Sequence, residues 1–259
     1  LKKLEHYGMT VIQPAVGLLA CKDVGAGKLP SEEELMDYIL QEIRFEKDLV
    51  GKKILITAGP TVESIDPVRF ISNHSTGKMG YALATAAVAR GLETVLVSGP
   101  VALTPPAGLF RFDGVETAAQ MSETMKREAA EADLIIMCAA VADFRPKRIA
   151  PLKIKKHSAE MVLELEPTED VLLALGSMKR PEQTLVGFAA ETDSIEQNAL
   201  DKMRRKYLDW IAANIVGVPG QGFESENNAV VLYSKNGDKH VLPLDSKSRI
   251  AEQILQIIL

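Results

Sequence analysis

From residue 53 onward, short apolar runs alternate along the chain with hydrophobic positions at helical spacing. The apolar runs predict strands at residues 53–58, 94–98, 134–139, 184–188 and 209–214, with a weaker strand near Phe110. The helical periods predict helices at residues 78–90, 118–132, 169–175 and 195–206. Because this alternation is typical of the α/β class, we expect a Rossmann-like, doubly wound, mostly parallel sheet.

The pattern changes near the C-terminus. Two apolar stretches, 229–234 and 239–242, flank Asn236-Gly237, a pair that favours a type I′ β-hairpin turn. A final helix, capped by Asp245 or Ser246, follows the hairpin and carries a repeating apolar face. We therefore expect a C-terminal β-hairpin and helix to complete one domain over residues 50–259.

Residues 1–49 follow a different pattern. Residues 14–29 form a glycine-punctuated loop, and Ser31 with the acids after it starts a helix that runs toward Leu49. One loop and one helix cannot bury a core of their own. We expect this segment to be a remnant of an upstream domain or an arm on the main one, with a linker near residues 50–52 and the chain a piece of something longer.

Composition narrows the class of protein. The chain has 259 residues, 46% of them hydrophobic, and a formal net charge of −5, which gives no reason to expect a nucleic-acid partner. No apolar run approaches the roughly 18 residues that a membrane span needs, and no secretory signal opens the chain. The two cysteines, Cys21 and Cys138, lie far apart, which suits a reduced cytoplasmic protein.

The long polar loop after the first strand of the main domain is the first candidate site. It ends in Ser75-Thr76-Gly77-Lys78 at the start of a helix, where backbone N–H groups and the helix dipole favour an anion such as phosphate. The alternative is that Ser75 or Thr76 only caps the helix. Neither the dinucleotide fingerprint G-x-G-x-x-G nor a Walker A loop follows Ala58.

Two further segments carry candidate chemistry. Residues 138–145 leave a buried strand at its C-terminal end, where open α/β sheets bind ligands, and Asp143 there accepts hydrogen bonds either from a ligand or from the next turn. Cys138 is more consistent with a packed core thiol than with a nucleophile. The basic run at residues 153–156, with Lys202 and Lys206 on one helix face, suits either a polyphosphate or a solvated surface. The four histidines show no ligand spacing, so metal ligands stay unknown.

Together, these segments resemble the bacterial, CTP-dependent phosphopantothenoylcysteine synthetase family of coenzyme A biosynthesis. The resemblance runs from residue 53 to the C-terminus and rests on seven features in order: ITAGPT, DPVRFISNHSTGKMG, CAAVADFRP, KIKK, GFAAET, the Lys202 and Lys206 pair, and QGFESENNA.

Residues 1–49 are similar to the end of the flavin-dependent phosphopantothenoylcysteine decarboxylase, which bacteria commonly fuse ahead of the synthetase. The segment PAVGLLACKDVGAGKLP carries this likeness, and Cys21 matches the position of that family's proton donor. Lys22 and Lys28-Leu29 depart from the family pattern. The flavin-binding bulk is not in this chain, so FMN is expected only in that missing domain and no decarboxylation is expected here.

The resemblance implies a reaction and its partners. CTP, with Mg²⁺, activates 4′-phosphopantothenate as an acyl-cytidylate, and the amine of L-cysteine then displaces CMP to give 4′-phosphopantothenoylcysteine. The resemblance also implies a homodimer, in which the hairpin or the segment 144–167 is an arm that reaches the partner's site.

The same resemblance assigns roles to residues. Asn73 would hold the activated acyl carbonyl, Arg69 would support its loop, and Lys153 would neutralise the triphosphate from a flap. Residues implied in CTP binding are Ala139, Ala140, Asp143, Lys153, Glu169, Asp170, Val171, Leu172, Phe188, Lys202 and Lys206. Two positions depart from the family: Ile215 stands where Asp is typical, and Glu169 where Pro is usual.

Two other functions compete with the synthetase. The doubly wound pattern also suits an NAD(P)-dependent oxidoreductase of Rossmann type, which the absent glycine fingerprint disfavours. A noncatalytic nucleotide-binding module is the third possibility.

Overall fold

The structure, a computed structural model, describes residues 11–18, 23–43, 47–155, 161–191, 194–215 and 225–259. It divides into two compact units, Leu1–Glu46 and Lys47–Leu259. Leu49 is buried in the core of the second unit, so the division falls a few residues before the linker expected at residues 50–52.

The first unit contains a β-hairpin, β1 (Ala15–Leu18) with β2 (Val24–Lys28), followed by the helix α2 (Glu32–Ile43). The prediction of a loop over residues 14–29 is therefore wrong. Gly17 and Gly25 pair across the hairpin, and glycine gives no strand signal in sequence although it can pair once a partner strand is present. The predicted cap is confirmed, since the Ser31 hydroxyl accepts from Glu34 N–H and the Glu34 carboxylate from Ser31 N–H. Cys21 lies outside the described residues.

A single eight-stranded sheet organises the second unit, in the order β14-β13-β12-β11-β8-β3-β6-β7. Six neighbouring strands run parallel, and the last two form the antiparallel C-terminal hairpin. Their bounds are β3 (Lys53–Ala58), β6 (Glu93–Ser98), β7 (Arg111–Gly114), β8 (Leu134–Met137), β11 (Thr184–Glu191), β12 (Trp210–Ile215), β13 (Asn227–Ser234) and β14 (Lys239–Ser246). The predicted α/β class and doubly wound, mostly parallel sheet are confirmed.

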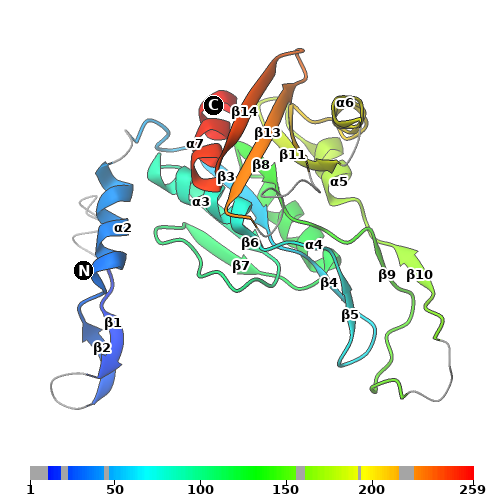
Figure 1. Cartoon of the computed structure of the whole chain (residues 1–259), viewed down its shortest axis with the longest axis horizontal. Coiled ribbons are helices and arrows are strands. Elements are labelled where there is room, and N and C mark those ends of the chain that lie inside the picture. The colour runs from blue at the N-terminus through cyan, green and yellow to red at the C-terminus, as the bar shows by residue number, and fades with distance from the viewer. Residues whose placement is uncertain (1–10, 19–22, 44–46, 156–160, 192–193, 216–224) are drawn as a thin grey trace. The chain divides into compact units, whose positions relative to one another are not determined.

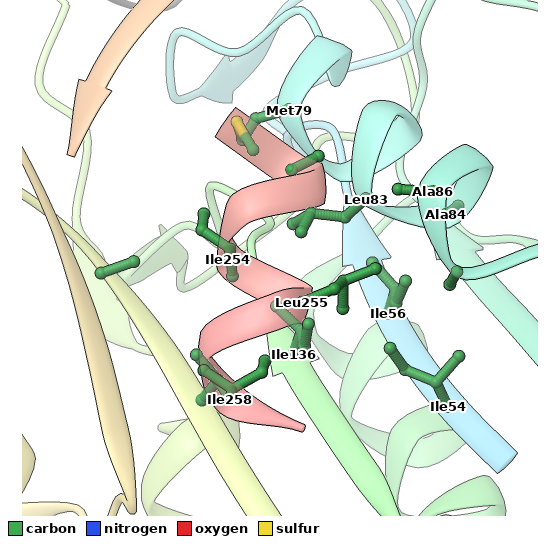
Figure 2. Close-up of a cluster of buried hydrophobic side chains, with 14 of the residues drawn as sticks. Ile54, Ile56, Met79, Leu83, Ala84, Ala86, Ile136, Ile254, Leu255 and Ile258 are labelled. Carbon is green, nitrogen blue, oxygen red and sulfur yellow. The ribbon is translucent and has the colours of Figure 1, made fainter. Parts of the chain in front are cut away.

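Helices cover both faces of this sheet (Figure 1). One face carries α3 (Lys78–Ala89) and α7 (Lys247–Ile258), and the other carries α4 (Ala118–Ala129), α5 (Val171–Met178) and α6 (Ile195–Arg205). Figure 2 shows Ile54 and Ile56 of β3 packing with Leu83, Ile254 and Leu255 of α3 and α7. Alternate residues of each strand thus pack into two separate hydrophobic cores, one on each face of the sheet, as expected for strands buried on both faces.

Two small ribbons were not predicted. Within the first polar loop, β4 (Val62–Ser64) pairs with β5 (Phe70–Ser72), and after the sheet β9 (Phe144–Pro146) pairs with β10 (Leu165–Pro167). Each strand has only three residues, too few for an alternating pattern to identify it.

Several element ends also differ from the sequence prediction, two of them beside the later site. The strand expected over 134–139 ends at Met137, and α5 begins at Val171 because Asp170 caps it. Ser246, one of the two caps predicted for the final helix, caps α7. Within the described part of the chain, no helix has both the length and the apolar character needed to cross a membrane.

Candidate functional site

A cavity of about 460 Å³ opens at the carboxyl ends of the parallel strands, the edge at which open α/β sheets bind ligands. It brings together segments that lie far apart in sequence. Its lining comprises residues 73–80 with Cys138, Ala139, Ala140, Val141, Asp143, Phe188, Ala189, Ala190, Lys202, Asn214, Asn228 and Lys247.

The first turn of α3 forms one wall. Gly77 is the N-cap with φ of 76°, it has no side-chain cap, and its own N–H donates to Ser75 Oγ at 3.3 Å. The expectation that Ser75 or Thr76 caps the helix is therefore wrong. A left-handed cap favours glycine, and a Cβ at Gly77 would lie 2.9 Å from Val101 Cγ1. No side chain therefore caps this end of α3, which lines the cavity.

The segment after β8 forms the facing wall. Thr57 Oγ1 accepts from the N–H groups of Cys138 and Ala139 at 3.0 Å each, and the Ala140 N–H donates to the Gly59 carbonyl at 2.9 Å. These bonds turn the chain away from the sheet and leave Ala139 and Ala140 at the cavity. Burial raises the pKa of the Cys138 thiol to about 12, so it stays protonated at neutral pH and is no nucleophile.

Asn73 joins the two walls. Its side-chain amide Nδ2 donates to the Val141 carbonyl at 3.0 Å, which ties the end of β5 to the segment after β8. Asn73 and Asp143 both line the cavity. An amide has two N–H donors, so the bond to Val141 leaves a second donor for a ligand.

The two lysines predicted on one face of α6 have different surroundings. Lys202 lines the cavity and its Nζ donates to the Phe188 carbonyl at 2.8 Å. Lys206 lies outside the lining, and its Nζ is 2.8 Å from Asp170 Oδ2. Asp170 in turn accepts from the Leu173 N–H at 3.0 Å. Partial burial opposes ionisation of Asp170, but Lys206 and that backbone donor outweigh it and lower its pKa.

The other predicted contacts at residues 169–172 also lie outside the lining. Glu169 accepts from the Ser122 hydroxyl at 2.6 Å and pairs with Lys126, while Val171 and Leu172 are buried against the sheet. These residues fix the start of α5 beside α4.

Arg69 and Lys153 lie on the adjoining ribbon and on the segment that crosses it. Asp66, whose side chain is fully buried, accepts from the N–H groups of Val68, Arg69 and Ile154, and Arg69 Nη1 donates both to Asp66 and to the Ile154 carbonyl at 3.1 Å. Burial opposes ionisation, yet these donors lower the pKa of Asp66 from 3.8 to about 2. The side chain of Lys153 is exposed and outside the cavity lining.

Three polar lining residues were given no role from sequence: Asn214, Asn228 and Lys247. The sequence pattern identified Ser246 as a possible helix cap and gave no reason to assign a role to Lys247 beside it. No spacing pattern in the sequence links Asn214 to Asn228. Among the described residues, no group of three or more His, Cys, Asp and Glu is placed to hold a metal ion. The side chain of Ile215 is not described.

Comparison with known proteins places this chain in a family. Residues 49–259 match the family model described as DNA/pantothenate metabolism flavoprotein C-terminal domain. The Coenzyme A biosynthesis bifunctional protein CoaBC of Bacillus subtilis (strain 168) is 48% identical over 259 residues, which cover 98% of this chain and 63% of that protein. The chain thus spans less than two thirds of this relative.

Two solved structures are similar to this chain. The C-terminal domain of a CoaBC protein is 45% identical with a TM-score of 0.70, covering 82% of this chain and 96% of that one. A Cab2 variant in complex with phosphopantothenate-cysteine is 20% identical with a TM-score of 0.65, covering 88% and 92%, and shows the common fold alone. The chain belongs to the DNA/pantothenate metabolism flavoprotein C-terminal domain family.

Proposed function

We propose that this chain carries the ligase that joins 4′-phosphopantothenate to L-cysteine, with CTP as the activating nucleotide. The observation that carries the proposal is that one cavity gathers residues from four separate segments whose roles the family resemblance implies. They are Asn73, Ala139, Ala140, Asp143, Phe188 and Lys202. The name of the Bacillus subtilis relative supports coenzyme A biosynthesis as the pathway.

The nucleotide would lie across the carboxyl ends of β8 and β11. Ala139 and Ala140 have no bulk to keep a planar base from the backbone, Asp143 offers acceptors to ribose hydroxyls, and Lys202 offers a cation to phosphate. The missing glycine fingerprint disfavours NAD(P) at the β3–α3 turn.

Mg²⁺ would enter with the triphosphate. The described residues hold no ready-made cluster of metal ligands, and Mg²⁺ commonly binds through nucleotide phosphates, one or two carboxylates and water. Asp143 is the carboxylate in the described lining. The ion would reduce the charge repulsion that a carboxylate meets as it approaches the triphosphate.

The chemistry requires positioning and charge stabilisation rather than a protein nucleophile. The carboxylate of 4′-phosphopantothenate would attack the α-phosphorus of CTP and release pyrophosphate, giving the acyl-cytidylate. The amine of cysteine would then attack the acyl carbonyl, lose its proton and displace CMP. Asn73 would donate its second amide hydrogen to that carbonyl, and Lys153 would lie over the phosphates when its segment closes.

Residues 1–49 would be the end of a flavin-dependent decarboxylase domain, in keeping with the bifunctional relative. FMN would bind to parts of that domain outside this chain, and Cys21 would be its proton donor. The synthetase domain would occupy residues 50–259.

A homodimer is also proposed, through the ribbons beside the cavity. Large apolar side chains are exposed on β5, β9 and the segment that follows β9, at Phe70, Phe144, Ile149 and Leu152. Contiguous exposed apolar surface is typical of an interaction site. Light scattering of the purified chain tests this.

Thermal-shift measurements with CTP, ATP and NADPH separate the candidate functions. Stabilisation by CTP alone together with pyrophosphate release supports the ligase. Stabilisation by NADPH would favour the oxidoreductase, and stabilisation by CTP without turnover would favour a binding module.

Lys202→Ala should raise the KM for CTP by about 10- to 100-fold, because hydrogen bonds to charged groups contribute about 1.5–3 kcal/mol. The KM for 4′-phosphopantothenate should change little. Lys206→Ala is the matched control, one turn along the same helix but paired with Asp170 outside the cavity, and its effect should be smaller. Steady-state kinetics with each substrate varied in turn decides this; equal losses for both substrates would indicate a folding defect.

A further inference from the structure

The helix that carries Lys202 buries few apolar side chains. Among the residues of α6, all of which the structure describes, Ala199 and Met203 alone are buried. Its N-cap, Ser194, makes no side-chain hydrogen bond to the helix. Helix α7, by comparison, buries five apolar residues: Ile250, Ala251, Ile254, Leu255 and Ile258. Because apolar packing is the main force that holds a helix on a sheet, the position of α6 depends more on its polar contacts than that of α7 does.

The C-terminal hairpin supplies such contacts at the first turn of α6. Lys239 Nζ, on β14, is 2.6 Å from Glu196 Oε2 of α6, and the same ammonium group lies 5.4 Å from the centre of the Tyr233 ring on β13. Tyr233 Oη is 3.5 Å from Glu196 Oε2. A cation, a carboxylate and a phenol from three elements thus meet at the start of the helix.

Tyr233 gives this cluster a fixed base. It is 5% exposed, and its backbone pairs with Ile211 of β12 within the central sheet. Burial, and then Glu196, raise the pKa of Tyr233 above its ordinary 10, so the phenol stays protonated at neutral pH and can donate to Glu196. The hydrogen bond with Glu196 also raises the pKa of Lys239, so the ammonium group keeps its charge.

Lys202 lies between two attachments of α6. The hairpin holds Glu196 near the start of the helix, and the pair of Lys206 with Asp170, at 2.8 Å, holds its end. Between them, Lys202 Nζ reaches the Phe188 carbonyl at 2.8 Å and lines the cavity. A shift of the first turn would therefore move the Lys202 ammonium group relative to the nucleotide, and small misplacements of a positioning group are costly.

We propose that Lys239 is a positioning residue for the nucleotide: placed over the ring of Tyr233, it holds Glu196 and the start of α6, and so sets Lys202 for its contact with the phosphates of CTP. The proposal rests on the proposed ligase function. Lys239, Tyr233 and Glu196 all lie outside the cavity lining, so they act through α6 rather than by contact with the substrate.

Glu196→Gln gives a sharp test, because charge and position predict opposite results. Removing a carboxylate near a polyphosphate should, by charge alone, tighten the binding of CTP. Loss of the attachment should instead raise the KM for CTP by about 2- to 5-fold, the size expected for a partly exposed ion pair. The kcat and the KM for 4′-phosphopantothenate should change little. Lys239→Met should have the same effect, and Lys239→Arg, which keeps the cation, should retain the wild-type KM.

The Lys202→Ala background shows whether the effect passes through Lys202. If it does, Lys239→Met should add little to the rise in the KM for CTP that Lys202→Ala causes by itself, since the positioned group is gone. Effects of the two substitutions that simply multiply would overturn the proposal. Arg204→Met is the matched control, because it removes a cation of the same helix whose ion pair, with Asp201, lies within α6. It should leave the KM for CTP unchanged.

Titration with CTP followed by thermal shift measures binding without turnover. Wild-type protein that binds CTP, with weaker binding by Glu196→Gln and by Lys239→Met, supports the positioning role even if no ligation occurs. Tighter binding by Glu196→Gln, or wild-type affinity in both variants, would overturn the positioning role and leave the ligase intact. Wild-type protein that gains no stability from CTP would overturn the ligase and the positioning role together. A variant that melts at a lower temperature but keeps the wild-type affinity would assign the cluster to stability alone.

Discussion

Lys153→Gln should slow formation of the acyl-cytidylate by about 10²- to 10³-fold, the usual cost of removing one well-placed group that stabilises developing charge. Lys153 is exposed, so the substitution should leave the fold intact and act only when substrates are bound. Pyrophosphate release measured without cysteine isolates this half-reaction. Lys147→Gln is the control, because it removes the same charge from the same segment.

The contacts of Asp66 fix the position of the segment that carries Lys153. Asp66 accepts from the N–H of Ile154, the residue next to Lys153, at 3.1 Å, and so holds that segment against the ribbon formed by β4 and β5. Its lowered pKa, about 2 against an ordinary 3.8, means that this attachment contributes stability above pH 4 and loses it as the pH falls toward 2. The attachment is therefore complete at neutral pH.

Asp66→Asn tests the attachment of the segment at Ile154 without removing the charge of Lys153. It should weaken the hold on Ile154 and reduce the rate while Lys153 keeps its charge, since an amide is a poorer acceptor for several N–H donors than a carboxylate. If Lys153→Gln released pyrophosphate at the wild-type rate, Lys153 would be a solvated surface charge and the segment would have no part in activation.

The central fold could be predicted from sequence because its signals are local and repeated. The strand β3 was predicted with the bounds that the structure has, since Ile54, Leu55 and Ile56 form an unbroken apolar run buried on both faces. The C-terminal hairpin followed from Asn236-Gly237, but the predicted type I′ turn is wrong, because Gly237 has a positive φ of 96° and Asn236 does not have a positive φ.

The β1–β2, β4–β5 and β9–β10 pairs could not be predicted, because their sequence signals are neither local nor repeated. Strands of three residues, or strands rich in glycine such as β2, are stabilised by the chain that pairs with them. The turn of the β4–β5 ribbon is held by the side-chain carboxylate of Asp66, which accepts from the N–H groups of Val68 and Arg69. No periodicity in the sequence marks such a contact. Such elements form through tertiary pairing, which overrides local propensity.

The site could be predicted in part. The motif resemblance pointed to Asn73, Asp143 and Lys202, which the structure brings to one cavity. The resemblance could not show that Lys206 pairs with Asp170 outside the cavity. The i,i+4 spacing of Lys202 and Lys206 places both on one helix face but does not say which groups of the neighbouring elements each lysine contacts. Lys247 was missed because a lysine after a helix cap is ordinarily exposed, whereas here tertiary packing around the start of α7 buries it.

Asn73→Asp should slow the attack of cysteine by about 10²- to 10³-fold, the usual cost of losing one oxyanion donor, and should slow activation by CTP less. The amide Nδ2 donates to the Val141 carbonyl at 3.0 Å, and that bond holds the remaining amide hydrogen in a fixed direction. A carboxylate has no donor for either position. It would face the Val141 carbonyl with like partial charge and would add negative charge beside the oxyanion.

The acyl-cytidylate should therefore accumulate in this variant. Quenching after incubation with CTP, 4′-phosphopantothenate and cysteine, followed by mass measurement of the intermediate, detects it directly. Asn236→Asp makes the same exchange in the exposed turn between β13 and β14 and should leave turnover unchanged. Asn73→Ala removes the donor without adding charge, so trapping in both Asn73 variants would show that the missing donor is responsible. Normal turnover with no trapped species would restrict Asn73 to its bond with Val141, which by itself holds the end of β5 to the cavity wall.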